Sequence, residues 1–273
     1  MRYFLGLDGG GTGCRVRLVD AEGRALGEGV AGPANIMSDV TGATAAIFEA
    51  SQQALQDRPP AEVAACLGIA GARISGAVGW LPQKLPFGRC KVLGDGEIAV
   101  AGALGARDGI VAALGTGSVF TRQLAGAFTS IGGWGPVLGD EGGGAWMGRQ
   151  LLARVLRAVD GLEPRTPLVE SMLESLGGPQ RIVGFARDAV GADFAAQVPA
   201  ILHAGDDPLA QTILAEAQGH IEAGIARLQP DPPLPVIFAG RLGQVFAPRI
   251  TRWAQRDALG SALDGALRLA RGL

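Results

Sequence analysis

The sequence predicts an α/β protein made of two related domains. Residues 3–19 and residues 110–124 share one pattern, in which a buried strand, a glycine-rich turn and an alternating polar and apolar strand follow one another. Segments with helical composition follow each of these regions. With 273 residues, 48% of them hydrophobic, the chain is long enough for two modest domains that each bury a core. A duplicated strand–turn–strand unit followed by helices therefore accounts for the whole chain.

The first part of the chain alternates short strands with helices. Three successive segments near the first glycine cluster are either continuously apolar or alternate between polar and apolar residues. This is typical of neighbouring strands in a β-meander. A helix then ends at Arg58-Pro59-Pro60, because proline cannot continue it. The expected elements are strands at 3–8, 15–19 and 25–30, a helix at 43–55, strands at 64–69 and 90–93, and a helix at 98–104.

The second part opens with strands and becomes mostly helical. Its Pro230-Asp231-Pro232-Pro233 run predicts a rigid break before a short buried strand. The expected elements are a strand at 110–114, a hairpin from 119 to about 131, helical structure at 139–159 and 166–228 (strongest over 210–228), a strand at 236–238, and helices at 244–257 and 261–271.

Composition excludes several classes of function. A net charge of −2 with 24 basic and 26 acidic residues gives no basic surface for nucleic acid, and only 5% of residues are aromatic. No apolar run is long enough to cross a membrane. The three cysteines are far apart, and only two histidines are present, so neither a disulfide framework nor a zinc site is expected. The N-terminus shows no signal-peptide pattern, so we expect a cytoplasmic protein with no nucleic-acid or membrane partner.

The first chemical motif is the run Asp8-Gly9-Gly10-Gly11-Thr12. Glycines let backbone N–H groups approach a phosphate, and the neighbouring carboxylate of Asp8 is suited to hold Mg²⁺ directly or through water. The alternative is a tight turn between two strands, although three successive glycines exceed what a turn needs. The run is neither a Walker A loop nor a dinucleotide-binding fingerprint, since a strand and not a helix follows it.

A second glycine turn follows the strand expected at 110–114. Its residues Gly115, Thr116, Gly117 and Ser118 offer hydroxyl groups and backbone N–H groups to a phosphate. An ordinary turn explains this motif equally well when it is taken alone. Together, the two glycine turns would hold a triphosphate from both sides.

Three further sites combine chemistry with a strand end or a long loop. Asp95 follows a predicted strand, where ligands bind in α/β domains, so it is either a general base or the N-cap of the next helix. In the loop 132–144, Trp134 can stack on a sugar, and Asp140 and Glu141 can accept hydrogen bonds from sugar hydroxyls or cap a helix. Gly240, after the strand at 236–238, leaves room for an adenine or makes an ordinary turn.

These motifs together resemble the sugar kinase/Hsp70/actin superfamily, and within it the N-acetylglucosamine kinase and BadF/BadG/BcrA/BcrD ATPase family. The resemblance covers essentially the whole chain. It rests on the order LGLDGGGT, PANI (33–36), the Asp95 region, GTGS, GGWGPVLGDEG and FAGRLG. The segments DGGGTGCRVRL, ANIM and 261–267 are similar to bacterial glucosamine kinases in particular.

The resemblance implies two actin-like (ribonuclease H-like) ATPase domains with an interdomain cleft. Residues 1–115, joined by a returning helix at 258–273, would form the N-terminal sugar- and phosphate-binding domain. Residues 116–257 would form the C-terminal nucleotide-binding domain.

The resemblance also implies a role for each matched residue. Asp95 would be the catalytic base, and Asp8 would hold Mg²⁺ through water. The ATP and phosphate contacts would come from Gly9, Gly10, Gly11, Thr12, Gly115, Thr116, Gly117, Ser118 and Gly240. The sugar contacts would come from Asn35, Asp95, Gly133, Trp134, Gly135, Asp140 and Glu141.

The implied activity is transfer of the γ-phosphate of ATP to the C6 hydroxyl of glucosamine, giving glucosamine 6-phosphate, with ATP and Mg²⁺ as cofactors. N-acetylglucosamine is the alternative substrate. The family also contains activator ATPases with an iron–sulfur cluster, but Cys14, Cys66 and Cys90 lack the paired arrangement that such a cluster requires. A non-catalytic binding protein is a third alternative, against which the presence of Asp8 and Asp95 argues. Because dimers are common in the family, the resemblance favours a homodimer.

Overall fold

The computed structural model describes residues 1–273, which form two compact units. Unit 1 comprises residues 1–109, 121–128 and 257–273, and unit 2 comprises residues 110–120 and 129–256. These bounds differ from the expected domains 1–115 with 258–273 and 116–257, because the strand at 110–114 belongs to unit 2 and the hairpin tip at 121–128 to unit 1. The tip is held in unit 1 by Gln123, whose Nε2 donates to the carbonyl oxygens of Gly105 and Arg107, both at 2.9 Å.

Unit 1 is organised around a five-stranded mixed sheet. Its strands are β1 (Tyr3–Gly9), β2 (Cys14–Asp20), β3 (Ala25–Ala31), β4 (Val63–Ile69) and β5 (Arg89–Gly94), in the order β3-β2-β1-β4-β5. β1, β4 and β5 are parallel, and the β1–β2 and β2–β3 pairs are antiparallel. The last residues of the parallel strands, Gly9, Ile69 and Gly94, are paired in register. The carboxyl ends of these three strands therefore lie along one edge of the sheet.

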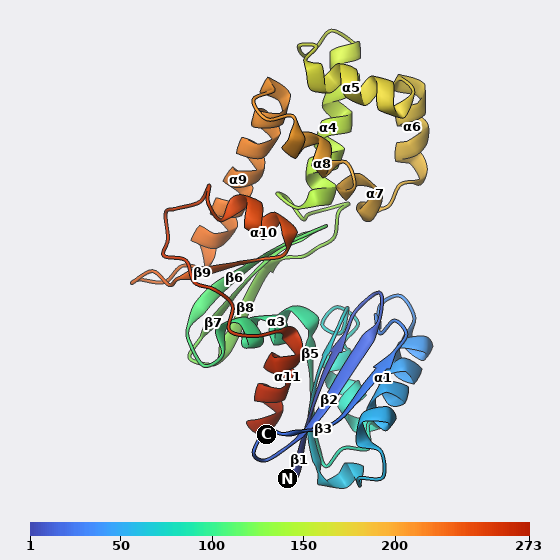
Figure 1. Cartoon of the computed structure of the whole chain (residues 1–273), viewed down its shortest axis with the longest axis vertical. Helices are drawn as coiled ribbons and strands as arrows, with labels where there is room; N and C mark the ends of the chain where they lie inside the picture. Colours follow the sequence, from blue (N-terminus) through green and yellow to red (C-terminus); the bar gives the residue numbers. More distant parts are fainter. The chain divides into compact units, whose positions relative to one another are not determined.

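Helices cover both faces of this sheet, as Figure 1 shows for α1 (Val40–Leu55) on one side and α3 (Asp95–Leu104) with α11 (Ala262–Arg271) on the other. Leu5 and Leu7 of β1 belong to the core beneath α1. On the opposite face, Phe4 joins a smaller core with residues of α3 and α11. Alternate residues of one strand thus serve two cores, as expected for a sheet covered on both sides.

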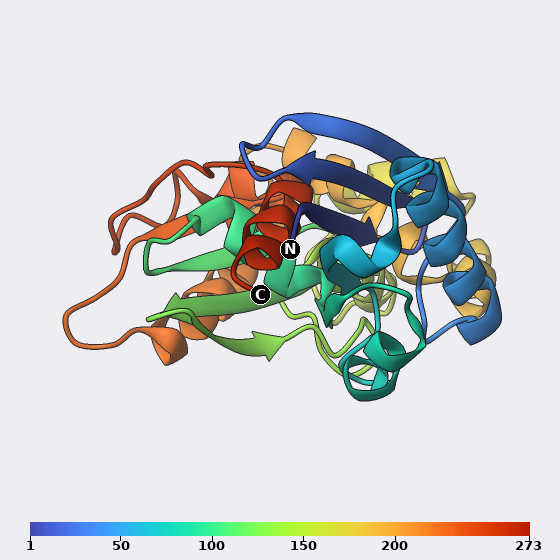
Figure 2. The same ribbon diagram turned by 90° about the horizontal axis from the view of Figure 1, so that it is seen from below.

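The C-terminal helix α11 makes an unusually close contact with α3. A Cβ atom at Gly102 would lie 1.8 Å from the carbonyl oxygen of Ser261, and one at Gly265 would lie 2.0 Å from that of Ile98. The helix backbones therefore touch, which only glycine permits. Figures 1 and 2 show the chain's two ends next to each other in this unit, where Arg89 also hydrogen-bonds the carbonyl oxygen of Leu273.

Unit 2 contains most of a second, four-stranded sheet and a group of helices. The strands are β6 (Gly109–Leu114), β7 (Ser118–Leu124), β8 (Ala127–Gly132) and β9 (Val236–Ala239), in the order β8-β7-β6-β9, with β6 and β9 parallel. The helices are α4 (Gly144–Val159), α5 (Pro167–Leu176), α6 (Pro179–Asp188), α7 (Gly191–Ala195), α8 (Val198–His203), α9 (Pro208–Leu228) and α10 (Arg241–Phe246). Their apolar faces meet in one core that includes Leu151, Val155 and Ile213. None of the helices in the chain is both long enough and apolar enough to cross a membrane.

Most expected elements are confirmed, with two corrections. The helix expected at 244–257 is wrong, because α10 ends at Phe246 just before Pro248, which cannot continue a helix. Residues 254–256 instead run beside β9, where Val236 donates to Ala254 and accepts from Arg256. The helical start expected at 139 is also wrong, because Asp140 and Gly142 have φ angles of +61° and +79°, which no α-helix accommodates. α4 therefore begins at Gly144.

Asp207 links two helix starts in unit 2. Its carboxylate accepts hydrogen bonds from the backbone N–H groups of Leu168, at 2.9 Å, and of Leu209, at 2.9 Å. Burial raises the pKa of Asp207, but these bonds, with those from Ala210 and the Thr166 side chain, outweigh burial and hold it below its ordinary value. One carboxylate thus caps α9 and fixes the first turn of α5.

The α3–α11 contact predicts a large cost for adding one methyl group at Gly102. Gly102→Ala should lower the free energy of unfolding by about 3 kcal/mol, since the obstacle is backbone and cannot turn away. Gly79→Ala is the matched control in the same unit: it lies in the short helix α2 (Ala77–Trp80) with nothing within 4 Å of a Cβ, so it should be neutral or stabilise by up to about 1 kcal/mol. Urea unfolding followed by circular dichroism measures both. Equal stability of the two variants would contradict the close contact.

The depressed pKa of Asp207 predicts an acid-labile helical region. Since the folded-state pKa lies below the unfolded one, the stabilisation is present at neutral pH and is lost as the pH falls below about 4. Asp207→Ala should lower the free energy of unfolding at neutral pH by about 2–3 kcal/mol, through loss of a cap and an unpaired Leu168 N–H. Asp207→Asn keeps an acceptor oxygen and should remove only the pH dependence. An unchanged pH profile in Asp207→Asn would count against this role.

Candidate active site

Two carboxylates lie at the carboxyl edge of the parallel strands of unit 1. Asp8 is the penultimate residue of β1 and is paired with Gly68 of β4. Asp95 directly follows Gly94, the last residue of β5, and is exposed. The two side chains are close enough for the charge of Asp95 to raise the pKa of Asp8. The strand register therefore brings together two residues that are far apart in the sequence.

Asp95 is the first residue of α3 and not its N-cap, so the alternative role as a cap is wrong. The N-cap position is occupied by Gly94, whose N–H donates to Glu97 Oε2 at 2.8 Å. The only hydrogen bond of the Asp95 carboxylate in the structure is from the N–H of Gly96, at 3.0 Å. An exposed carboxylate with free oxygen lone pairs can accept a proton from a bound hydroxyl group.

The electrostatic surroundings of Asp8 combine burial with one cation. Burial raises the pKa of Asp8, the charge of Arg15 lowers it, and the charge of Asp95 raises it again. The net result is a pKa above the ordinary value. Arg15 lies opposite Asp8 on β2, with its Nη2 atom 3.5 Å from Asp8 Oδ2. The side chain of Asp8 is 22% exposed, so one cation or water can reach it.

These residues fit Mg²⁺ only as part of a nucleotide complex. No cluster of three or more His, Cys, Asp or Glu side chains is present that could hold a metal ion by itself. Mg²⁺ keeps several water molecules and is held by one or two carboxylates together with phosphate oxygens. Asp8, with Asp95 nearby, supplies that donor set, and the phosphates would complete it.

The first glycine turn connects β1 and β2 beside these carboxylates. Gly9 is required by packing, because a Cβ atom there would lie 2.9 Å from that of Ala34. Gly10 closes the turn by donating to the carbonyl oxygen of Gly13 at 2.9 Å. Gly11 has no such requirement: nothing lies within 4 Å of a Cβ atom there, and its φ is not positive. Gly11 and Thr12 are exposed, so their backbone N–H groups are open to a ligand.

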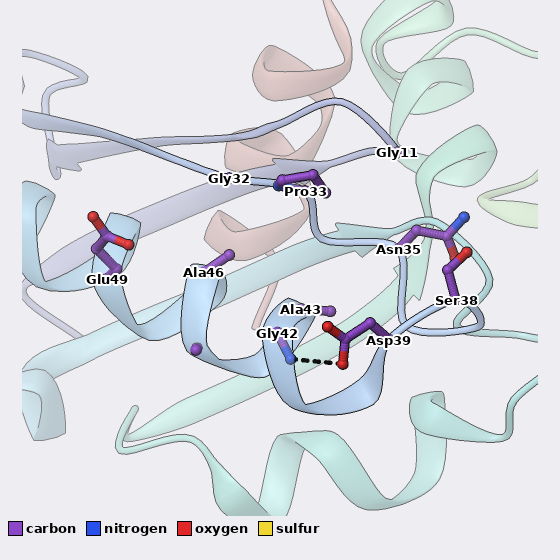
Figure 3. A pocket seen from close by; sticks show the side chains of 11 residues that line it. Gly11, Gly32, Pro33, Asn35, Ser38, Asp39, Gly42, Ala43, Ala46 and Glu49 are labelled. Carbon is purple, nitrogen blue, oxygen red and sulfur yellow. Dashed lines mark hydrogen bonds between the residues drawn. The ribbon is translucent and has the colours of Figure 1, made fainter.

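A cavity of about 400 Å³ adjoins this turn in unit 1 (Figure 3). Gly11 and Asn35 line it, as do Pro33 and Asp39. Asn35 Oδ1 accepts from the N–H of Met37 at 3.0 Å, which fixes the side chain and leaves its Nδ2 for a ligand. Asp39 caps α1 by accepting from Gly42 at 2.9 Å, drawn as a dashed line in Figure 3. Gly11, which is expected to bind phosphate, and Asn35, which is expected to bind the sugar, therefore line the same cavity.

A second cavity, of about 390 Å³, gathers expected site residues within unit 2. It lies where the turn between β6 and β7 meets the end of β9 and the loop after β8. The first N–H groups of α4 are used by this turn, since Gly144 and Ala145 donate to the carbonyl oxygens of Gly115 and Thr116, both at 2.8 Å. The expected residues that line the cavity are Gly115, Gly117, Ser118, Gly133, Asp140 and Gly240.

Asp140 joins the loop after β8 to the glycine turn. Its backbone φ of +61° is unusual for a residue with a side chain. Its Oδ1 accepts from the N–H of Gly135 at 3.2 Å, and its Oδ2 would be 2.3 Å from a Cβ at Gly117. Burial raises the pKa of this carboxyl, Gly135 lowers it and Glu141 raises it, with a net increase. Asp140 is therefore a buried acceptor that shapes the loop and not a helix cap, since Gly143 occupies the N-cap position of α4.

Other expected residues of unit 2 differ in their exposure. Trp134 is 73% exposed, and Glu141 and Thr116 are also exposed. Ser118 is buried, and its Oγ donates to the carbonyl oxygen of Glu141 at 2.8 Å. Its hydroxyl proton is therefore not available to a phosphate. Gly240 has a φ of +84° and contacts Leu114, as a strand-to-helix turn requires, yet it also lines the cavity.

The structure thus collects the expected residues into one group in each unit. Unit 1 holds Asp8, Gly9, Gly10, Gly11, Thr12, Asn35 and Asp95, and unit 2 holds Gly115, Thr116, Gly117, Ser118, Gly133, Trp134, Gly135, Asp140, Glu141 and Gly240.

Sequence reasoning missed three side chains that support these groups. Arg15 pairs with Asp8, and the alternation of β2 could have placed it on the same face. Glu97 holds the start of α3, as its position three residues after Gly94 suggests. Arg149 donates to the carbonyl oxygen of Pro136 at 2.6 Å and so fixes the Trp134 loop, for which the sequence gives no signal.

Known proteins resemble this chain over nearly its whole length. A glucosamine kinase of Vibrio cholerae is 31% identical over 285 aligned positions, which cover 99% of this chain and 96% of that protein. An N-acetyl-D-glucosamine kinase of Dictyostelium discoideum is 32% identical and is matched by 63% of this chain over 60% of its own length.

Solved structures confirm the expected two-domain α/β fold of sugar kinases and actin-like ATPases. A Chromobacterium violaceum protein, provisionally assigned as an N-acetylglucosamine kinase, is 31% identical and superposes with a TM-score of 0.82 over 99% of both chains. A ROK-family glucokinase of Streptomyces griseus is 20% identical and shares the fold, with a TM-score of 0.51 over 99% of this chain and 100% of that one. The sequence profile of one family matches residues 5–240. This chain belongs to the BadF/BadG/BcrA/BcrD ATPase family.

Proposed function

We propose that the chain is an ATP-dependent amino-sugar kinase that transfers the γ-phosphate of ATP to the C6 hydroxyl of glucosamine. The observation that carries this proposal is the meeting of Asp8 and Asp95 at one strand edge, beside an open glycine turn. The named relatives support the amino-sugar class, since both phosphorylate an amino sugar according to their names. The expectation drawn from the sequence alone therefore agrees with the relatives found.

Asp95 is the proposed base. As the C6 oxygen of the sugar forms a bond to the γ-phosphorus, the bond from that phosphorus to the β-phosphate oxygen of ATP breaks, and ADP leaves. The carboxylate of Asp95 accepts the hydroxyl proton and orients the oxygen for in-line attack. Its exposed place at the start of α3 leaves it accessible to the sugar.

The nucleotide contacts would come from both glycine turns. Backbone N–H groups of Gly11 and Thr12 would bind the β- and γ-phosphates, with Gly115, Thr116 and Gly117 as further contacts and Gly240 beside the adenosine. Asp8 would hold Mg²⁺ through water, and the ion would neutralise the charge of the phosphates. Arg15 would oppose the effect of burial on Asp8, because its positive charge lowers the pKa of that carboxyl.

The sugar contacts would come from Asn35 and from the loop that carries Trp134. The free Nδ2 of Asn35 would donate to a sugar hydroxyl, and the exposed Trp134 ring would stack on a sugar face. Asp140 is buried and hydrogen-bonded within its own loop, so the exposed carboxylate of Glu141 is the better partner for the ammonium group of glucosamine. N-acetylglucosamine is the second candidate substrate, because the Dictyostelium discoideum relative is named an N-acetyl-D-glucosamine kinase.

An activator ATPase with an iron–sulfur cluster is disfavoured by the state of the cysteines. Cys14 and Cys66 are fully buried, and burial raises the pKa of each thiol to about 12. A cluster needs thiolates, which these surroundings oppose. We further propose a homodimer, the state expected from the family resemblance, which size-exclusion chromatography with light scattering would test. The cytoplasmic location expected from the sequence remains part of this proposal.

Removal of the proposed base should abolish turnover. Asp95→Asn should lower kcat for glucosamine at least about 100-fold, because the carboxylate no longer accepts the proton. Asp57→Asn removes an exposed carboxylate elsewhere in unit 1 and should leave kcat unchanged. A coupled ADP-release assay with glucosamine, N-acetylglucosamine, glucose and no sugar measures the effect and ranks the substrates. Turnover that depends on no sugar, or full activity of Asp95→Asn, would overturn the proposed reaction.

The open space around Gly11 predicts a variant that weakens only nucleotide binding. Gly11→Ala should leave the free energy of unfolding within about 0.5 kcal/mol of wild type, because no protein atom meets the new methyl group. The same methyl group would stand where a phosphate approaches the backbone, so the Kd for ATP should rise about tenfold or more. Isothermal titration calorimetry measures the Kd, with Gly79→Ala as the control. An unchanged Kd would place the phosphates away from this turn.

A further inference from the structure

The loop after β4 has no assigned role in the proposed reaction, yet it contacts two parts of the candidate site in unit 1. Ala70 donates to the carbonyl oxygen of Gly9 at 2.8 Å and accepts from the N–H of Ile36 at 3.1 Å. Gly71, with a φ of +76°, lies against Asn35, since a Cβ atom there would be 3.0 Å from Asn35 Oδ1. The loop is therefore fixed both to the first glycine turn and to the residue expected to bind the sugar.

Arg73, further along this loop, reaches the strand end that precedes the proposed base. Its Cγ and Cδ atoms would be 3.6 and 3.5 Å from a Cβ atom at Gly94, the residue before Asp95. The aliphatic part of the Arg73 side chain therefore lies against Gly94. Its Nη1 atom is 3.9 Å from Glu97 Oε1 in the first turn of α3. The loop that contacts Asn35 is thereby connected to the helix that begins with Asp95.

Glu97 has a partner on each of its carboxylate oxygens. Oε2 accepts from the N–H of Gly94 at 2.8 Å, and Oε1 faces Arg73. The Glu97 side chain is 14% exposed, and a hydrogen bond that is shielded from water in this way is stronger than one at the surface. It fixes the backbone where β5 ends and α3 begins. Because Arg73 is 56% exposed, the ion pair adds little to the stability of the fold, and its effect is on where the carboxylate lies.

The position of Asp95 depends on this junction, because no other side chain forms a hydrogen bond with it. Its carboxylate accepts only from the neighbouring N–H of Gly96, at 3.0 Å. A general base must lie within hydrogen-bond distance of the hydroxyl group from which it takes the proton. A displacement of about 1 Å can lower a rate about 100-fold. The distance between Asp95 and a sugar held at Asn35 is therefore set by the backbone that carries each residue.

We propose that Arg73 and Glu97 are positioning residues, which hold the carboxylate of Asp95 at the correct distance from the bound sugar. This inference rests on the proposed kinase function. Neither residue would touch the reacting atoms. Glu97 would fix the start of α3 through its hydrogen bond with Gly94, and Arg73 would tie that start to the loop after β4.

Arg73→Gln tests the link between the loop and the helix. It removes the positive charge that faces Glu97 and should lower kcat for glucosamine about 10-fold, with the KM for ATP within about 2-fold of wild type. Arg73→Lys keeps a positive charge on a long side chain and should recover most of the lost kcat. Arg107→Gln removes the charge of an exposed arginine elsewhere in unit 1 and should leave kcat unchanged. Urea unfolding should give all three variants a stability close to that of the wild type.

Glu97→Gln keeps an acceptor oxygen for the N–H of Gly94 but loses the attraction to Arg73. It should lower kcat by a factor similar to that of Arg73→Gln. The double variant should be no slower than either single variant, because both remove the same interaction. Losses that multiply in the double variant would count against a joint role.

Asp95→Asn provides the background that separates positioning of the base from a general loosening of the fold. If Arg73 acts through Asp95, Arg73→Gln should not lower the residual kcat of Asp95→Asn any further. An equal loss in both backgrounds would show a merely structural role and would overturn the inference, as would full kcat of Arg73→Gln in the otherwise wild-type chain. Wild-type protein without sugar-dependent turnover would instead overturn the proposed function, and the inference with it.

Discussion

The parallel register of β1, β4 and β5 is the constraint on which the candidate active site depends. It places Asp8, Gly9 and Gly94 at one edge of the sheet, so that Asp95 is close enough to change the pKa of Asp8. Burial has the largest effect on the pKa of Asp8 and raises it, and the charge of Arg15 lowers it more than the charge of Asp95 raises it, so two carboxylates share the positive charge of one arginine. The site without ligand is therefore short of positive charge, which is the property that attracts a magnesium–nucleotide complex.

That register is maintained by packing on both faces of the sheet. On one face, Gly27 and Gly29 of β3 let the backbone of α1 approach, since a Cβ at either would lie within about 2.2 Å of a helix carbonyl oxygen. On the other face, α11 crosses α3 at Gly102. The last residues of the chain therefore support the sheet that carries the first motif. A sequence pattern along one segment cannot show such a dependence, because the contacting atoms come from segments that are separated in the sequence.

The sequence predicted the strands and their glycine turns well, because apolar periodicity and glycine clusters are local signals. It failed where a distant partner decided the outcome. Residues 254–256 have helical composition but pair with Val236, and the start of α4 is delayed by the backbone of Asp140, which buried contacts with Gly117 and Gly135 hold in place. The candidate residues of each unit were likewise predictable as types. The position of Arg15 could have been read from the alternation of β2, whereas that of Arg149 followed only from the folded chain.

The two glycine turns show how one motif serves different physical needs. In unit 1, Gly9 is required by packing, and Gly11 faces open space. In unit 2 the order is the opposite: the first glycine of the turn, Gly115, faces open space, and the later one, Gly117, is required by packing because it makes room for the carboxylate of Asp140. A sequence shows only that glycine recurs. The structure separates glycines that the fold needs from glycines that leave the backbone accessible, and only the second kind is a reason to expect a phosphate. By that criterion Gly11 is the residue through which the motif of unit 1 would bind its ligand, whereas the N–H of Gly115 already donates to the carbonyl oxygen of Gly117 at 2.9 Å.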